Sequence, residues 1–212
     1  MLDANTLEVI CLIFSLIFLT KDKSRFWLIT IAYLVVVVIT ELFAKYCGRT
    51  YHNNLWVYNI YTIFEAGYIC YGLYYFINDY INLKKFLIAT YILIIAIFSY
   101  FTFRYGILAY NAVTVSIMSV IFVIYTLLYF YLLLKDENYV DLKFHPAFWW
   151  IGGVLIFYFG GTIANIFDEI IQQKFLGKYN TRVIIYFTLN LFLYGFWSYS
   201  FTCRARQRKI CP

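Results

Sequence analysis

The chain of 212 residues has few charged residues, which make up 13% of it, and only 2 prolines. Water-soluble domains carry about 25% charged residues, whereas here 64% of the residues are hydrophobic and 24% are aromatic. This composition excludes an ordinary soluble domain and predicts an all-α, polytopic integral membrane protein. Because each crossing uses about 20 residues, no room is left for a separate soluble domain. We therefore expect one transmembrane domain over residues 1–212.

Proline, histidine and cysteine each exclude a class of site. Both prolines, Pro146 and Pro212, lie outside the predicted spans, so the helices lack the midplane breaks that are common in carriers. This lowers the expectation of a transporter without removing it. His52 and His145 fall in connecting segments, so no His-ligated metal is expected within the membrane. The 5 cysteines show no paired spacing for a metal or a disulfide framework. No cofactor, metal or nucleic-acid partner is expected.

Seven hydrophobic runs bounded by charged residues predict seven transmembrane helices. The predicted spans are residues 7–20, 26–44, 55–77, 86–103, 107–134, 147–167 and 183–203. The first is the weakest, and we interpret Asn5 and Glu8 at its start as a helix N-cap and its reciprocal partner. We interpret the run as a mature helix and not as a signal peptide, because the start is acidic and Lys21 follows it. The sequence thus predicts a seven-helix bundle.

The distribution of Lys and Arg predicts the orientation, because cytoplasmic loops retain positive charge. With the N-terminus outside, eleven of the 17 Lys and Arg residues lie on the cytoplasmic side. Four of them form the tail, at Arg204, Arg206, Arg208 and Lys209. We predict an outside N-terminus and a cytoplasmic C-terminus, in a membrane taken as the bacterial cytoplasmic (inner) membrane. We interpret the tail as a topology anchor; contact with anionic lipid headgroups is the alternative.

Two acids stand inside the predicted spans. Glu65 lies roughly 16 Å from the outer end of the third span, at 1.5 Å per residue, and Glu41 lies close to the outer end of the second. Ionisable groups cost a few kcal/mol to place in hydrocarbon, so each marks a candidate functional site. The alternative is that Glu65 bonds a tyrosine hydroxyl or a carbonyl group of a neighbouring helix and stabilises helix packing.

Polar and aromatic residues recur at three-or-four spacing along one face of the third span. They are Asn54, Tyr58, Tyr61, Glu65, Tyr68, Gly72 and Tyr75. The last span has a matching stripe at Tyr186, Asn190, Tyr194, Trp197 and Phe201. Asn111 and the group Asn165, Asp168 and Glu169 add amides and acids near the same outer end.

These stripes predict an outward-facing polar and aromatic pocket with Glu65 at its floor. The candidate ligand-binding residues are Glu65, Tyr61, Tyr58, Asn111, Asn190 and Glu41. The alternative is that these groups cap helix ends and satisfy one another, because polar residues favour membrane interfaces in any case.

The sixth span contains two glycine pairs, Gly152–Gly153 and Gly160–Gly161. Small residues let a second backbone approach closely in a membrane. We favour packing within the bundle as their use, and a homo-oligomer formed through this face is the alternative.

The function predicted from these features is that of a receptor-like or accessory membrane protein. It binds a small or lipid-like ligand in the outward pocket and couples to a cytoplasmic or membrane protein partner, with the lipid bilayer around it. The alternative is a transporter or oligomeric ion channel that uses Glu41 and Glu65 as a cation or proton path. An enzyme is not expected, because no second catalytic group stands at a suitable spacing from Glu65 or Asp168.

Overall fold

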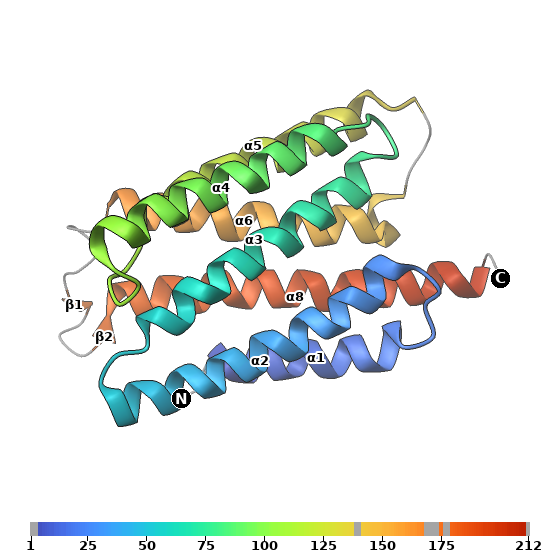
Figure 1. Cartoon of the computed structure of the whole chain (residues 1–212). Helices are drawn as coiled ribbons and strands as arrows, with labels where there is room; N and C mark the ends of the chain where they lie inside the picture. Colours follow the sequence, from blue (N-terminus) through green and yellow to red (C-terminus); the bar gives the residue numbers. More distant parts are fainter. Residues whose placement is uncertain (1–3, 138–140, 168–173, 176–178, 211–212) are drawn as a thin grey trace.

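The computed structural model describes residues 4–137, 141–167, 174–175 and 179–210, and in these ranges the chain is all-α apart from one two-residue strand pair (Figure 1). The helices are α1 (Ala4–Leu19), α2 (Arg25–Tyr51), α3 (Leu55–Ile77), α4 (Lys84–Tyr105), α5 (Ala112–Lys135), α6 (Pro146–Ile166) and α8 (Thr181–Ile210), with a 3-10 turn η1 (Leu142–Phe144). The strands β1 (Lys174–Phe175) and β2 (Tyr179–Asn180) pair antiparallel. Asp168, Glu169 and Lys178 lie outside the described residues.

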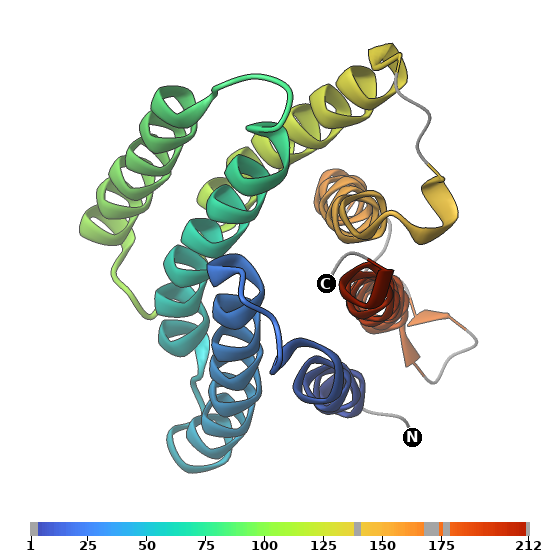
Figure 2. The ribbon, with the colours of Figure 1, turned by 90° about the vertical axis from the view of Figure 1, so that its right-hand side faces the viewer.

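The helices pack lengthwise around a common interior. Helix α8 packs against both α1 and α6, and α6 packs against α5. Helix α3 packs against α2, α4 and α5, while α1 packs against α2. Seen along the helices in Figure 2, α4 lies on the outside of this arrangement, and its buried residues are Leu87 and Ile94. Six helices therefore surround the interior, and α4 covers one side of it.

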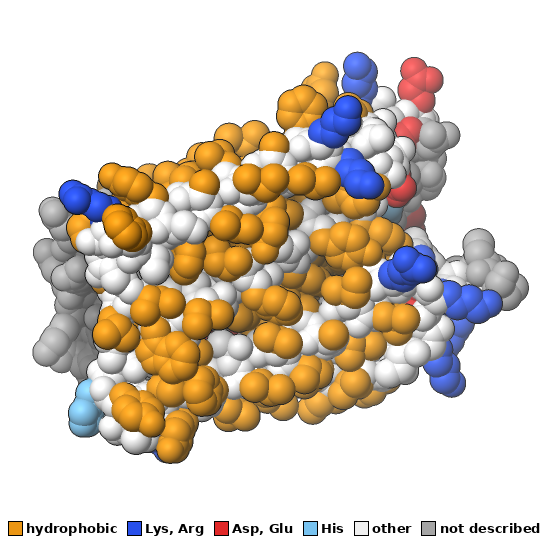
Figure 3. All heavy atoms as spheres, in the orientation of Figure 1, with side chains coloured by type: hydrophobic (Ala, Val, Ile, Leu, Met, Phe, Trp, Pro, Cys, Tyr) orange, Lys and Arg blue, Asp and Glu red, His pale blue; other side chains and the backbone are white. Residues whose placement is uncertain are grey.

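Five of the described helices, α2, α4, α5, α6 and α8, are long and apolar enough to cross a membrane. Exposed hydrophobic side chains cover much of the face shown in Figure 3, as a surface in contact with lipid requires. Helix α1 has 16 residues, which is roughly 24 Å at 1.5 Å per residue. Helix α3 has 23 residues, but its tyrosines, asparagine and glutamate lower its hydropathy.

The predicted helix ends were less accurate than the predicted helices. The fifth span was predicted to begin at residue 107, but α5 begins at Ala112, because Gly106 with a φ of 80° follows the end of α4. The second span was predicted to end at residue 44, but α2 continues to Tyr51, where His52 takes a φ of 53°. The last was predicted over 183–203, but α8 continues to Ile210. Charged residues mark where a helix leaves hydrocarbon, and the helix itself can continue beyond them.

The two ends of the helix array differ in charge. The α1–α2, α3–α4 and α5–α6 connections and the C-terminus lie at one end, which we call the basic end (Figure 1). Figure 3 shows lysine and arginine side chains gathered there. The α2–α3 and α4–α5 connections and the start of α8 lie at the opposite end.

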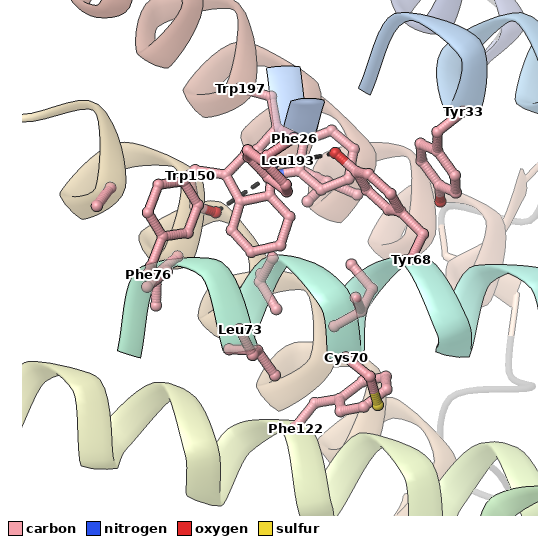
Figure 4. Close-up of a cluster of buried hydrophobic side chains, with 14 of the residues drawn as sticks. Phe26, Tyr33, Tyr68, Cys70, Leu73, Phe76, Phe122, Trp150, Leu193 and Trp197 are labelled. Atoms are coloured by element: carbon pink, nitrogen blue, oxygen red, sulfur yellow. Dashed lines mark hydrogen bonds between the residues drawn. The ribbon is translucent and has the colours of Figure 1, made fainter. Parts of the chain in front are cut away.

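The middle of the array contains a buried aromatic cluster, defined by Phe26, Tyr33, Tyr68, Trp150 and Trp197 (Figure 4). The Trp150 and Trp197 rings stack with centroids 5.4 Å apart and an interplanar angle of 2°. Trp197 Nε1 donates to the Trp150 carbonyl at 3.1 Å, and Trp150 Nε1 donates to the Tyr68 hydroxyl at 3.3 Å. Because each indole N–H has an acceptor, burial of the cluster leaves none of these donors unpaired.

The glycines of α6 bring this helix close to α8. A Cβ built at Gly153 would lie 3.3 Å from the Leu193 carbonyl oxygen, and one built at Gly160 would lie 2.4 Å from a Leu189 methyl group. These close contacts agree with the interpretation that the glycines serve helix packing within the bundle. A homo-oligomer through the same face stays a prediction.

Candidate functional site

A cavity of about 310 Å³ lies among α1, α2, α3, α5, α6 and α8. The aromatic cluster bounds it toward the basic end through Tyr33 and Trp197, which line it. Toward the opposite end the lining continues to Tyr110, a side chain that is exposed at the surface. The cavity therefore extends from the middle of the helix array to its opposite end.

Glu65 lines this cavity from α3 and is half-buried. The Tyr158 hydroxyl of α6 donates to Glu65 Oε1 at 2.8 Å. Tyr158 itself is 3% exposed, and its ring meets the Phe122 ring edge-on with centroids 5.0 Å apart. In the described part of the chain, the partner of this carboxyl group is thus a hydroxyl and not a cation. The alternative that we held open, a bond to a tyrosine of a neighbouring helix, is what the structure shows, and the same carboxyl group also faces the cavity.

Tyr61 lines the cavity one turn from Glu65. Its hydroxyl lies 2.7 Å from the hydroxyl of Tyr33 on α2. The Tyr33 ring stacks on Tyr68 with centroids 3.7 Å apart. The aromatic cluster therefore holds the Tyr33 hydroxyl in place beside that of Tyr61. This arrangement holds α2 and α3 together beside the cavity.

Glu41 and Tyr58 line the cavity nearer the opposite end. The Tyr58 hydroxyl donates to Glu41 Oε2 at 3.1 Å, which joins α3 to α2. The Tyr58 hydroxyl thus points to an acid within the fold. Two of the acids in the lining therefore each accept a hydrogen bond from a tyrosine, at two different depths.

Asn190 lines the cavity from α8, and its amide Nδ2 donates to the Tyr186 carbonyl at 2.9 Å. The Tyr186 hydroxyl in turn donates to Asn165 Oδ1 of α6 at 3.0 Å. Near this end of the cavity the Arg182 guanidinium lies 5.6 Å from the Tyr186 ring centroid and 5.9 Å from that of Tyr110. The guanidinium group thus lies between two rings that line the cavity.

The structure does not place Asn111 in this cavity. Asn111 precedes α5 as its N-cap, and its Oδ1 accepts a hydrogen bond from the Thr114 amide at 3.1 Å. It lines a separate pocket of about 240 Å³ formed by the α4–α5 connection. The expectation that Asn111 shares one site with Glu65 was wrong, because the residue caps a helix where a helical position was predicted.

Glu8 was missed as a cavity residue. The interpretation of Asn5 as an N-cap was wrong, because α1 already begins at Ala4. Glu8 lies within the helix, is 4% exposed and lines the cavity from α1. The sequence could have indicated this role, since Glu8 is the acidic residue of the mainly apolar helix α1. Tyr158 of α6 was missed as well, and no local pattern marked it.

The described lining contains Glu8, Glu41 and Glu65 together with seven tyrosines, and no Lys or Arg side chain is part of it. Aromatic rings present a negative face to a cation, and an ionised carboxyl group attracts a cation. The electrostatics of the cavity therefore favour a positively charged group. Among the described residues no cluster of three or more His, Cys, Asp or Glu side chains is arranged to hold a metal ion.

The chain was compared with protein families, curated proteins and solved structures, and no match was found in any of the three comparisons.

Proposed function

We propose that the chain is a receptor-like or accessory seven-helix protein of the bacterial cytoplasmic membrane, and that its cavity binds a small or lipid-like molecule with a positively charged group. The observation that carries this proposal is the convergence of Glu8, Glu41 and Glu65, from three different helices, on one cavity whose described lining lacks Lys and Arg. An acid in hydrocarbon is costly. A ligand with a positively charged group would offset part of this cost at each of the three acids.

The size and the lining of the cavity support a small cationic ligand. Its volume of about 310 Å³ is at the lower end of the range for ligand pockets, roughly 300 to 1,000 Å³. A cation over a tyrosine ring gains about 0.5 to 2 kcal/mol, most where water is excluded. Tyr61 and Tyr194 line the cavity together with Glu65.

In the proposed topology all seven helices cross the membrane, with the N-terminus outside and the basic end in the cytoplasm. Helices α1 and α3, which are the least suited by length or hydropathy, both line the cavity. Part of their polar surface therefore faces the interior. The excess of Lys and Arg at the basic end agrees with the positive-inside rule, and it supports an outward-facing cavity.

Coupling to a partner is proposed to pass through α8 and its neighbour α6. Helix α8 carries the cavity residues Tyr186, Asn190 and Trp197 and continues to the basic end as one helix of 30 residues, roughly 45 Å at 1.5 Å per residue. A ligand that prefers one placement of this helix over another shifts the population of placements. A displacement of α8 at the cavity is then transmitted to the cytoplasmic end, because the helix is continuous over this distance.

The test is site-directed labelling in a variant without native cysteines. Glu65→Cys is expected to react with a membrane-impermeant, charged thiol reagent added from outside, because the cavity admits water. In a Thr62→Cys variant, which places the thiol in the same lining and keeps the three acids, tetramethylammonium chloride is expected to slow the reaction relative to the same concentration of sodium chloride. A folded Glu65→Cys protein that stays unlabelled contradicts an outward, water-accessible cavity. Labelling that is equally fast in both salts contradicts a cation site.

Ile60→Cys is the matched control on the same helix. The Ile60 side chain is 53% exposed and is absent from the cavity lining, so its thiol is expected to face lipid. It should react slowly with the charged reagent from either side, with or without tetramethylammonium. Comparison of the two positions separates access through the cavity from general loosening of α3.

A transporter or channel is the second candidate, and the placement of Glu41 and Glu65 at two depths of one cavity favours it. The stacked Trp150 and Trp197 rings argue against an open path, because they fill the interior between the cavity and the basic end. Flux of protons and monovalent cations into liposomes, measured for the unaltered chain and for Glu65→Gln, decides between the candidates. Equal and negligible flux in both excludes transport.

A further inference from the structure

A groove of about 860 Å³ lies at the basic end between the end of α1 and the last turns of α8. It forms because α1 ends at Leu19 while α8 continues to Ile210, so that α8 extends beyond its neighbour (Figure 1). The apolar side chains of Ile17 and Phe18 contribute to its lining from α1. Six cations from both segments complete it: Lys21, Lys23, Arg204, Arg206, Arg208 and Lys209.

Asp22 is the acid within the described lining of this groove, and two arginines neutralise it. Arg204 Nε donates to Asp22 Oδ2 at 2.8 Å and its Nη2 donates to Oδ1 at 3.3 Å, while Arg208 Nε lies 3.4 Å from Oδ2. Arg208 Nη2 also donates to the Phe18 carbonyl. These bonds fix the two arginines against the end of α1. The exposed lysines Lys21, Lys23 and Lys209 face the groove around this fixed centre.

The charge of the groove calls for an anionic occupant. Six cations against one carboxylate leave a large positive excess in the lining, at the level where α1 emerges from the apolar region. Anionic headgroups attract such segments by about 1 kcal/mol for each Lys or Arg near the surface. A groove between two helices adds a defined place for one phosphate, which a plain topology anchor does not require.

The apolar side of the groove indicates a lipid and not a soluble phosphate. Ile10, Ile13 and Ile17 recur at three-or-four spacing on α1 and are 43%, 48% and 64% exposed. They form a stripe that leads from the groove along the outside of the helix. An acyl chain lying along this stripe brings its phosphate to the end of α1, beside Lys21 and Lys23.

We propose that this groove binds an anionic phospholipid, with the phosphate between the α1–α2 connection and the basic tail of α8 and one acyl chain along the Ile10–Ile13–Ile17 stripe. The lipid then ties α8 to α1 at the basic end. This site is independent of the ligand proposed for the cavity.

The test compares lipid binding to two charge-matched variants by native mass spectrometry in detergent. The groove variant is Lys21→Gln/Lys23→Gln/Lys209→Gln, which leaves Asp22 and its two arginines intact. The control is Lys84→Gln/Lys85→Gln/Lys135→Gln, which removes three exposed cations from the same end but outside the groove. We expect the groove variant to bind phosphatidylglycerol about a hundredfold more weakly than the unaltered chain, at about 1 kcal/mol for each lysine removed, and the control to change by less than about twofold.

Three outcomes overturn the proposal. One is equal weakening in both variants, which indicates general attraction to the basic end. Another is binding of phosphatidylcholine as tight as that of phosphatidylglycerol. The third is displacement of the lipid by millimolar glycerol phosphate, which indicates a soluble phosphate ligand. Should the triple variant fail to fold, the single variants Lys21→Gln and Lys209→Gln carry the same comparison, each with an expected loss of about fivefold.

Discussion

Replacement of Gly72 by alanine tests how tightly the aromatic cluster is packed. A Cβ built at Gly72 of α3 would lie 2.3 Å from Cη2 and 2.7 Å from Cζ2 of the Trp150 ring. Carbon atoms in contact are ordinarily about 3.5 to 4.0 Å apart, so the ring has to move by about 1 Å. Trp150 is fixed on its other sides by its stacking on Trp197 and by its hydrogen bond to Tyr68. The ring therefore has little room to move.

The expected cost follows from two opposing contributions. Insertion of a methyl group into a filled interior costs about 1 to 3 kcal/mol, while a helical Gly→Ala change returns up to about 1 kcal/mol. Gly72→Ala should thus lose roughly 1 to 2 kcal/mol in the free energy of unfolding. Gly195→Ala on α8 is the control, because a Cβ there meets nothing within 4 Å. It should be neutral or stabilising, by at most about 1 kcal/mol.

The assay is thermal unfolding of both variants in the same detergent, followed by far-UV circular dichroism. A gap of roughly 2 kcal/mol between the variants corresponds to a Tm difference of about 4 to 8 °C for a chain of this size. Near-UV circular dichroism should change in Gly72→Ala alone, because the tryptophan pair is disturbed. Equal Tm values and equal near-UV spectra would refute close packing of Trp150 on α3.

Two further predictions concern the connections at the two ends. Burial raises the pKa of Asp22, but the hydrogen bonds from Arg204 and the Ser24 amide and the arginine charges outweigh it, so this pKa lies below its ordinary value of 3.8. Asp22→Asn should therefore lower stability by about 1 kcal/mol at pH 7, and this gap should narrow as pH falls below about 4 and through the lowered pKa of the folded protein; a gap that does not narrow at all on acidification contradicts the ion pair. Asn59 Nδ2 donates to the Ile107 and Ala109 carbonyls at 2.7 and 2.8 Å. Asn59→Leu should raise the rate of proteolysis in the α4–α5 connection several-fold, with equal rates contradicting this.

The sequence predicted the helices well because hydrocarbon imposes a simple condition. Each span had to be a long apolar run, and the charged residues between runs marked its limits. It predicted helix ends poorly for the same reason, since the basic residues from Arg204 onward are continuous with α8. Glu65, Tyr61 and Tyr58 could be placed on one face of α3 because helical periodicity is local.

The partners of these residues could not be predicted from the sequence. Tyr158 and Glu65 are 93 positions apart, and their contact depends on which helices are neighbours, which periodicity does not determine. Glu8 was assigned a local capping role because a pattern of two residues fitted it, whereas its position in the array places it on the cavity. Asn111 shows the converse error, because its local capping role was real and a long-range role was predicted.

The contacts of α8 limit how a ligand could be sensed. Trp197 Nε1 donates to the Trp150 carbonyl, and further along the helix the Ser200 hydroxyl donates to the Pro146 carbonyl at 2.8 Å. Gly153 brings the two backbones close on the other side of the Trp150–Trp197 bond, at Leu193. Movement of α8 alone would break this series of contacts with α6, so the two helices are expected to move together.

Two hydrogen bonds of the described residues join the pair formed by α6 and α8 to α3. One runs from Tyr158 to Glu65 and the other from Trp150 to Tyr68. A cation that binds Glu65 competes with Tyr158 for the carboxyl group, at the place where the pair can separate from α3. Glu65, one of the three acids that line the cavity, is thus also one of the residues that join α3 to the pair formed by α6 and α8. Ligand binding and helix displacement are therefore expected to depend on the same hydrogen bond, and Tyr158→Phe should alter both together.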